Sequence, residues 1–336
     1  MFKDKENILR LVEEEFPRSA VIVLGDAMLD RYYFGDVHRI SPEAPVPITR
    51  VTRERDTLGG AANVAHNLAL LGCRTILAGV CGADDNRVRL VRLLEARGID
   101  HSALVTADRP TTTKLRVIGG HQQMLRLDFE ETGAIPPETE ERLKAALDSA
   151  MHSPPGCMVI SDYAKGACTA NLCQYIIKQC AAAGIPQVVD PKGPDWRKYA
   201  GAFLVTPNVK ELGEAAGAPV PNEDGPVRRA AERVRRKFGI KNVIVTRSEK
   251  GLSLIADGPP LHIPTHAQEV FDVSGAGDTV AAVVAAGLAA GMPLAEAAYL
   301  ANMAAGFVVG KLGTYAISRA ELAETLRAAG CGLPKP

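Results

Sequence analysis

Short apolar runs alternate with amphipathic, helix-like stretches along most of the chain. The apolar runs are almost continuously hydrophobic, as in strands that are buried on both faces of a parallel sheet. The predicted strands cover residues 21–25, 75–82, 157–161, 187–190, 203–207 and 243–247, and the clearest predicted helices cover residues 59–72, 170–184 and 225–239. This order predicts an α/β fold built on a doubly wound, mostly parallel sheet with helices on both faces.

Two stretches depart from this regular alternation. Residues 31–60 place Pro42, Pro45 and Pro47 among β-rich segments, and residues 111–130 resemble two strands around a Gly-Gly turn. We predict that they form one small antiparallel sheet, made from two separated pieces, which acts as a lid over the carboxyl ends of the main strands. Ligands of open α/β sheets bind at those ends. A projecting sheet has exposed edges and an apolar face, so we also predict that the lid pairs with a second copy in a homodimer.

Composition narrows the class of protein. The 336 residues are 46% hydrophobic and 23% charged, which is typical of a globular protein, and we expect a single domain over residues 1–336 with the lid inserted. The 39 basic and 39 acidic residues balance, so no global field favours nucleic acid as a partner. A small anionic substrate needs only local positive charge.

Targeting and redox signals are absent from the sequence. The amino-terminal segment is charged and lacks the apolar core of a secretory signal, and the longest apolar stretch, near residues 279–290, is too short for a membrane span. The seven cysteines show neither C-x-x-C nor zinc spacing. These features predict a cytoplasmic protein with reduced thiols and no membrane partner, in which Cys173 and Cys180 pack in the core.

The strongest chemical signal lies in residues 272–291, where Asp-Val-Ser-Gly-Ala-Gly leads into a helix of small residues. Glycine lets backbone N–H groups turn toward a ligand, and the positive end of a helix favours an anion. Asp278 falls in the first turn of this helix. A carboxylate beside an anion hole suits phosphoryl transfer, because it can accept the proton of the acceptor hydroxyl. The alternative is that Asp278 only stabilises its own helix terminus.

A second group of polar positions lies near the amino terminus. Asp26 follows the first predicted strand, Asp30 comes four residues later, and Gly59, Gly60 and Asn63 open the next helix. Asp and Asn side chains at strand ends suit sugar hydroxyls, which both donate and accept hydrogen bonds. Asp30 could instead form a turn, and Asn63 could be a helix cap. The chain contains neither a P-loop motif nor a dinucleotide-binding fingerprint after its first strand, which disfavours a nicotinamide dehydrogenase.

Taken together, these motifs resemble the PfkB, or ribokinase, family of carbohydrate kinases. The resemblance rests on the early glycine pair with TPNVKE (206–211), TRSEKG (246–251) and DVSGAGDT (272–279), and it covers essentially the entire chain. Further segments, among them RISPEAPVPI (39–48), SDYAKGA (161–167) and VVDPKG (188–193), resemble the members of the family that phosphorylate heptose 7-phosphate at its anomeric carbon. The resemblance implies a ribokinase-like fold, with a sugar phosphate and ATP as the small-molecule partners.

The resemblance also implies roles for individual residues. Asp278 is the expected catalytic base, and Gly275, Ala276 and Gly277 the expected anion hole. On the nucleotide side, Asn208 and Glu211 match an N-x-x-E element that organises Mg²⁺ largely through water. The remaining positions implied are Thr246, Ser248, Gly277 and Asn302 for the nucleotide, Asp26, Gly59, Gly60 and Asn63 for the sugar, and Asp272 and Ser274 near a loop that holds a monovalent cation in the family.

A phosphorylated sugar needs positive charge that a plain sugar does not. The candidates lie in segments that match the heptose kinases, and they are Arg39, Lys114, Arg116, Lys165 and Lys192. Each could instead form a surface or lid salt bridge. Arg126 is expected to brace Asp128 within the lid.

The function implied is ATP-dependent phosphorylation of D-glycero-β-D-manno-heptose 7-phosphate to the 1,7-bisphosphate, a step toward ADP-heptose for lipopolysaccharide core or S-layer glycan. Since the sequence ends at Pro336, soon after its last predicted helix, we expect the stand-alone kinase without a nucleotidyltransferase domain. The alternatives are a PfkB kinase acting on another sugar or sugar phosphate, of the ribokinase or fructokinase type, and a regulator that binds sugar or nucleotide without catalysis.

Overall fold

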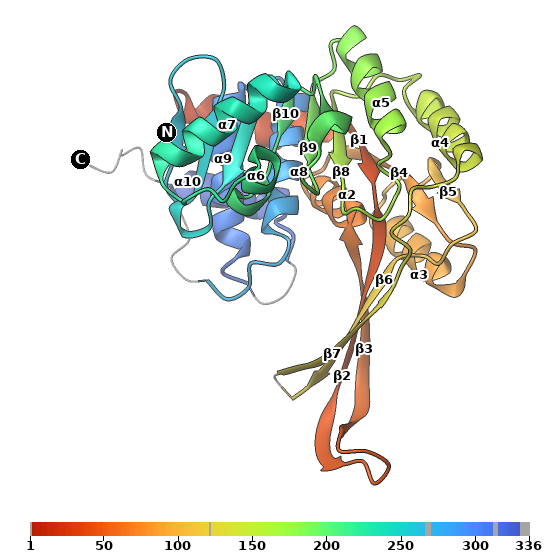
Figure 1. Cartoon of the computed structure of the whole chain (residues 1–336). Helices are drawn as coiled ribbons and strands as arrows, with labels where there is room; N and C mark the ends of the chain where they lie inside the picture. The colour runs from red at the N-terminus through yellow and green to blue at the C-terminus, as the bar shows by residue number, and fades with distance from the viewer. Residues whose placement is uncertain (1, 121, 266–269, 312–314, 330–336) are drawn as a thin grey trace.

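A nine-stranded sheet forms the body of the molecule in the computed structural model, which describes residues 2–120, 122–265, 270–311 and 315–329 (Figure 1). The strands from β11 to β5 are parallel to their neighbours, and β12 and β13 add an antiparallel edge. In spatial order the strands are β13 (Leu261–Ile263), β12 (Leu252–Ile255), β11 (Asn242–Thr246), β10 (Leu204–Val205), β9 (Gln187–Asp190), β8 (Cys157–Ser161), β1 (Ala20–Gly25), β4 (Arg74–Cys81) and β5 (Leu104–Thr106).

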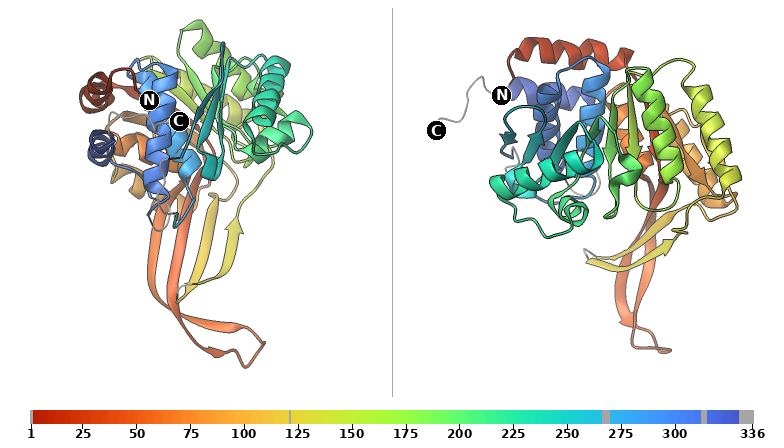
Figure 2. Two further views of the ribbon diagram at one scale, coloured as in Figure 1. Left: turned by 90° about the vertical axis from the view of Figure 1, so that its left-hand side faces the viewer. Right: turned by 45° about the horizontal axis from the view of Figure 1, so that its top comes forward.

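Helices cover both faces of this sheet, and each face has its own core (Figure 2). Along β1, Val21 and Val23 point into one core while Ile22 and Leu24 point into the other, as the two-residue period of a strand requires. The first core contains α1 (Lys5–Arg10), α2 (Ala61–Leu70), α3 (Asp85–Glu95), α8 (Ala276–Ala289), α9 (Leu294–Val308) and α10 (Arg319–Ala328). The second contains α4 (Pro137–Ala150), α5 (Ala170–Ala182), α6 (Val209–Ala216) and α7 (Asp224–Phe238). The predicted doubly wound α/β fold is confirmed.

One predicted helix boundary differs from the structure, while the predicted burial of two cysteines is confirmed. Gly59 and Gly60 were expected to open a helix, but they end a strand, and the helix begins one residue later at Ala61. The chain turns at Gly60, whose φ of 55° lies in the left-handed region that glycine tolerates. Cys173 and Cys180 are fully buried on α5, as predicted. No helix in the described part of the chain is both long enough and apolar enough to span a bilayer.

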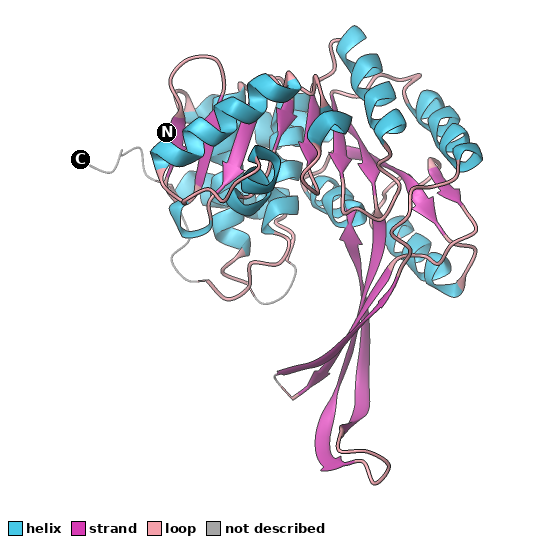
Figure 3. Ribbon diagram, in the orientation of Figure 1, coloured by secondary structure: helices cyan, strands magenta, loops and turns pink. Residues whose placement is uncertain are grey.

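A four-stranded sheet projects from one end of the body and is built from the two segments that were predicted to form the lid (Figure 3). We call it the lid, although its action as a cover stays a prediction. Its order is β3 (Pro47–Gly60), β2 (Ala27–Ile40), β6 (Thr113–Gly119) and β7 (Gln122–Phe129). The lid was expected to be antiparallel throughout, and this is wrong for its central pair, because β2 and β6 are parallel. Each hairpin leaves the body through its first strand, so the two outgoing strands lie side by side and run in the same direction.

Candidate active site

Loops at the carboxyl ends of the parallel strands surround a cavity at the edge of the body. This is the position at which open α/β sheets bind their ligands. The side chains and glycines that line it come from the ends of β8, β9, β10 and β11 and from the start of α8, and they are Asp162, Tyr163, Asp190, Pro191, Lys192, Thr206, Asn208, Glu211, Thr246, Gly275, Gly277 and Asp278. The structure thus brings together Asp278, its glycines and most of the predicted nucleotide positions, which lie far apart in the sequence.

The start of α8 places Asp278 at the bottom of this cavity. Gly275 precedes the helix with a φ of 83°, and no side chain caps the terminus. The N-terminal N–H groups and the positive end of the helix dipole are therefore directed to the cavity that Gly275, Gly277 and Asp278 line. This geometry suits an anion next to a carboxylate, as the sequence predicted.

Both oxygens of Asp278 accept a hydrogen bond from a protein side chain. The Nδ2 group of Asn63 donates to Oδ2 at 2.6 Å, and the hydroxyl of Tyr163 donates to Oδ1 at 2.6 Å. Burial raises the pKa of Asp278 to about 6, although these two hydrogen bonds oppose the shift. A carboxylate with a pKa near 6 is ionised at neutral pH yet is a better proton acceptor than an exposed one, which suits a general base.

Asn208 and Glu211 form a capping box at the start of α6. Oδ1 of Asn208 accepts from the Glu211 N–H at 2.9 Å, and Oε2 of Glu211 accepts from the Asn208 N–H at 3.0 Å. The other oxygen of Glu211, Oε1, pairs with Lys192 Nζ at 3.0 Å. The two side chains therefore order the helix terminus and also line the cavity. Lys192, predicted on the sugar side, lies next to Glu211 instead.

Asp190 also lines the cavity, although it is not among the site residues predicted from the sequence. It ends β9, and its pKa lies well above the usual range because of burial and the nearby carboxylates of Asp278 and Glu211. Carboxylate and amide oxygens of this kind are the ligands that Mg²⁺ accepts, usually with several waters retained. Asp190, Asn208 and Glu211 all line the cavity and carry oxygens of this kind, and those of Asn208 and Glu211 are already engaged within the protein, which suits a cation held largely through water.

Asp26 lies at the base of the lid but turns away from the cavity. Its Oδ2 accepts from the N–H groups of Tyr163 at 2.8 Å and Lys165 at 3.0 Å, and its Oδ1 accepts from that of Ala167 at 3.0 Å. The carboxylate is 3% exposed. Its contacts order the loop after β8, whereas its predicted contact with a sugar stays a prediction.

Three of the five candidate cations gather where the lid meets the body. Arg116 pairs with Asp30 at 2.9 Å, and Lys165 pairs with Glu130 at 2.6 Å. The ammonium of Lys114, which lies opposite Asp30 in the strand register, makes no hydrogen bond or ion pair within the described part of the chain. Burial, with the charge of Lys165, lowers the pKa of Lys114. The carboxylates of Glu130, Asp128 and Asp30 lie near enough to oppose this shift, but none of them is in contact with the ammonium, so an anion bound between Lys114 and Lys165 would find donors that are still available.

The remaining predicted positions lie in separate parts of the molecule. Arg39 is exposed near the far end of the lid and is not brought to the cluster formed by Lys114, Arg116 and Lys165. Thr246 ends β11 and lines the cavity, whereas Ser248 is exposed in the next turn, with a φ of 52°. In α9, the Nδ2 group of Asn302 donates to the Pro264 carbonyl at 2.7 Å. Asp272 accepts from the Ser274 N–H at 2.8 Å. Arg126 braces Asp128, as predicted.

The fold agrees with that of known sugar kinases. The ribokinase of Arabidopsis thaliana complexed with ribose and ATP superimposes with a TM-score of 0.72 at 20% identity, covering 93% of this chain and 99% of that one. The phosphofructokinase-2 of Escherichia coli in complex with potassium gives a TM-score of 0.75 at 20% identity, covering 92% and 98%. At such identity the likeness defines the fold alone, which is ribokinase-like.

Sequence comparison defines the family. A model of the pfkB family of carbohydrate kinases matches residues 18–321, and this chain therefore belongs to that family and is a carbohydrate kinase. The bifunctional protein HldE of Methylobacillus flagellatus is 46% identical over 326 residues, which are 96% of this chain and 67% of that protein. The HldE of Klebsiella pneumoniae strain 342 is 47% identical over 322 residues, which are 95% and 66%. The chain thus spans about two thirds of the length of these relatives.

Proposed function

We propose that this chain transfers the γ-phosphoryl group of ATP to O1 of D-glycero-β-D-manno-heptose 7-phosphate, giving the 1,7-bisphosphate. The product would be a precursor of ADP-heptose for lipopolysaccharide core or S-layer glycan. Membership in the carbohydrate kinase family and the high similarity to bifunctional HldE proteins support a kinase of this type. The finer choice of substrate rests on the segments of this chain that resemble heptose 7-phosphate kinases and on the charges at the base of the lid.

The environment of Lys114 is the observation that favours a phosphorylated sugar over a plain sugar as the substrate. Lys114 is half-buried next to Lys165, and although the carboxylates of Glu130, Asp128 and Asp30 lie nearby, its ammonium forms no ion pair of its own in the described residues, so it can donate directly to a phosphate. The adjacent Arg116 adds a planar donor suited to phosphate oxygens. We infer that the 7-phosphate binds among these three cations, whereas Arg39 and Lys192 serve elsewhere.

The reaction would proceed on residues that the structure brings together. Asp278 would take the proton of the anomeric hydroxyl, and the start of α8 would stabilise the charge on the transferring phosphoryl group. Asn208, Glu211 and Asp190 would hold Mg²⁺ largely through water, and that cation neutralises phosphate charge when it is bound. Thr246, Ser248 and Asn302 remain candidate contacts to ATP, and Asp272 and Ser274 remain candidates for a monovalent cation site.

An ADP-release assay over heptose 7-phosphate, unphosphorylated heptose, ribose, fructose 6-phosphate and fructose tests this assignment. We expect heptose 7-phosphate to give the highest kcat/KM. Preference for ribose or a fructose derivative would make the protein another kinase of its family. Failure to consume ATP with every sugar would favour a regulator that binds ligand without catalysis.

We also propose that two chains pair through the lid. Strand β7 is exposed along its full length, and its apolar side chains Leu125, Leu127 and Phe129 are 50%, 41% and 48% exposed. An edge strand that displays large apolar side chains is typically covered by a partner. From the sequence we expect a second copy of this chain to cover β7.

A further inference from the structure

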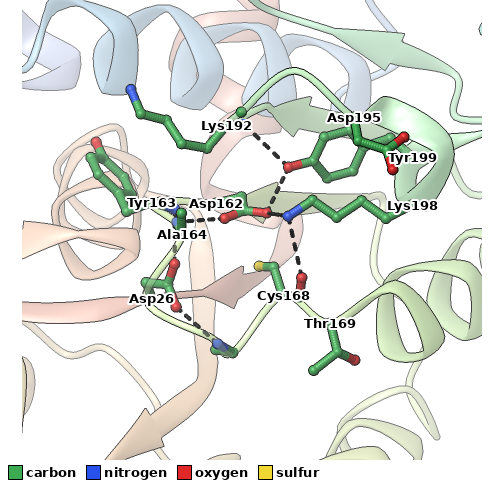
Figure 4. Close-up of polar contacts among 12 residues, drawn as sticks. Asp26, Asp162, Tyr163, Ala164, Cys168, Thr169, Lys192, Asp195, Lys198 and Tyr199 are labelled. Carbon is green, nitrogen blue, oxygen red and sulfur yellow. Dashed lines mark hydrogen bonds and ion pairs between the residues drawn. The ribbon is translucent and has the colours of Figure 1, made fainter. Parts of the chain in front are cut away.

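Asp162, the residue after β8, is the centre of a buried polar network beside the cavity (Figure 4). Its side chain is 1% exposed, and both of its oxygens have donors. Oδ1 accepts from the Ala164 N–H at 2.7 Å, while Oδ2 accepts from the Tyr199 hydroxyl at 2.6 Å and from the Lys198 ammonium. Such a fully satisfied buried carboxylate restricts the position of every group that donates to it.

The first arm of this network orders the loop that carries Tyr163. Ala164 adopts a φ of 56°, a left-handed conformation that costs a non-glycine residue energy and persists only where neighbours enforce it. Asp162 holds the N–H of Ala164, and Asp26 holds the N–H groups on both sides of it. The loop held in this way directs the Tyr163 hydroxyl to Oδ1 of Asp278.

The second arm reaches the cation side of the cavity. The Tyr199 hydroxyl donates to Asp162 and accepts from the Lys192 N–H at 3.1 Å. The side chain of Lys192 in turn pairs with Glu211 at 3.0 Å. One buried carboxylate is therefore connected to the expected proton acceptor through Tyr163 and to the expected magnesium side chains through Lys192.

We propose that Asp162 is a positioning residue for phosphoryl transfer, which holds the Tyr163 loop and the Lys192 loop in a fixed relation to each other. The inference rests on the proposed function. Asp162 is one of the residues that line the cavity, but only 1% of its side chain is exposed and its oxygens are occupied by Ala164, Tyr199 and Lys198, so it acts through the groups that donate to it. Both sides of the reaction must be aligned closely for an in-line transfer, and this network is a physical connection between them.

The test separates the two arms by substitution. Tyr163→Phe removes the hydrogen bond to Asp278 and should shift the acid limb of the kcat profile upward by roughly one pH unit. Tyr199→Phe breaks the second arm and should raise the dissociation constant of Mg·ATP about fivefold, measured by titration calorimetry. Asp162→Asn should produce both effects. The titratable groups that face Asp278 are Tyr163, Asp30 and Asp190, and the substitutions leave the last two unchanged.

Glu140→Gln is the matched control. Glu140 is also a buried carboxylate and pairs with Lys144 at 3.0 Å. It accepts from Thr169, which ends the loop after β8 and caps α5, but among the described residues it forms no hydrogen bond or ion pair with Tyr163 or Lys192. Loss of its charge should lower the thermal unfolding temperature without moving the pH limb or the nucleotide affinity. If folded Asp162→Asn behaves like this control, Asp162 is only structural and the proposal is overturned.

The outcomes also distinguish this inference from the proposed function. The calorimetric measurement needs no sugar, so it remains decisive even if the assay identifies an acceptor other than heptose 7-phosphate. Should Asp162→Asn fail to fold, Tyr199→Phe decides alone, because it keeps the aromatic packing and removes one hydroxyl. Wild-type affinity for Mg·ATP in that variant would overturn the proposal.

Discussion

The hydroxyl of Tyr163 lies 2.6 Å from Oδ1 of Asp278 and donates to it. Because Asn63 donates to the other oxygen, the carboxylate has no oxygen without a donor when no sugar is bound. An incoming hydroxyl must share or replace one of these contacts before it can give up its proton. Asn63 is buried within α2, whereas Tyr163 lines the cavity, so the contact from the Tyr163 hydroxyl is the one that a hydroxyl entering from the cavity would share.

Substitution of Asp278 by Asn should abolish turnover and leave the affinity for ATP within a few-fold. Loss of a general base typically costs about 10²–10⁴ in rate. Steady-state kinetics and nucleotide titration measure the two effects. A variant that keeps half of the wild-type kcat would refute the assignment of Asp278 as the base.

The activity of the wild-type enzyme should fall as the pH falls through about 6, since the base then becomes protonated. Removal of the Tyr163 hydroxyl takes away a contact that stabilises the charged form of Asp278. In Tyr163→Phe the acid limb of the kcat profile should therefore move to higher pH. An unchanged limb would mean that this hydrogen bond has no influence on the ionisation of the base.

The same carboxylate should destabilise the fold at neutral pH. Burial raises the pKa of Asp278 from 3.8 to about 6, so the folded state binds the proton more tightly than the unfolded one. The contribution of Asp278 to stability is greatest below pH 4 and declines as the pH rises toward and through 6. Ionisation of Asp278 lowers the free energy of unfolding by an amount on the order of 3 kcal/mol. The neutral side chain of Asp278→Asn does not ionise, so the variant avoids this loss.

Thermal unfolding at two pH values measures this effect. We expect Asp278→Asn to unfold a few degrees above the wild type at pH 7.5, with a smaller difference at pH 4.5. Tyr163 can accept as well as donate a hydrogen bond, so the amide fits its site. If the unfolding temperatures of variant and wild type differ by the same amount at both pH values, ionisation of Asp278 does not destabilise the fold.

Substitution of Lys114 by Met should narrow the preference for a 7-phosphorylated sugar over the plain sugar. A charge-assisted hydrogen bond is worth about 1.5–3 kcal/mol, which corresponds to roughly 10–100-fold in kcat/KM. Lys165→Met and Arg116→Met should act in the same direction. Arg126→Met is the matched control, since Arg126 is half-exposed in the lid and pairs with Asp128. If the control and the three variants behave alike, the phosphate lies elsewhere.

A charged residue on β7 should separate the proposed dimer. Leu127→Asp places a carboxylate on the exposed strand, where burial against a second lid would cost several kcal/mol. Light scattering should show a dimer for the wild type and a monomer for the variant, with little change in unfolding temperature. Wild-type protein that is monomeric at high micromolar concentration would contradict pairing through the lid.

The elements that could be predicted from the sequence are those with local patterns. Continuous apolar runs such as 21–25 and 157–161 formed parallel strands, and the Gly-Ala-Gly segment led into α8 with Asp278 in its first turn. The parallel pairing of β2 with β6 depends on where two distant hairpins leave the body, which no local pattern contains. The prediction therefore identified the segments of the lid correctly but gave the wrong relative direction for its two central strands, β2 and β6.

The same limit explains which site residues were missed. Lys165 and Lys192 each follow a strand and look alike in sequence, but the strand order places one against Glu130 and the other against Glu211. Tyr163 was missed because a tyrosine after a strand has no distinctive spacing. Its neighbourhood, SDYAKGA, was already singled out by resemblance, and that was the available signal.

Helix α8 packs against α2, β1 and β8. A segment from late in the sequence therefore lies against elements from the first half of the chain. Apart from Asp278, which this helix supplies, the groups proposed for the sugar phosphate precede residue 170, and those proposed for the nucleotide follow residue 185. On this proposed division, selection on the acceptor and selection on the donor would act on separate stretches of the gene. Changes in the first half would then alter the sugar that is accepted and leave the residues for the phosphoryl donor and the base intact.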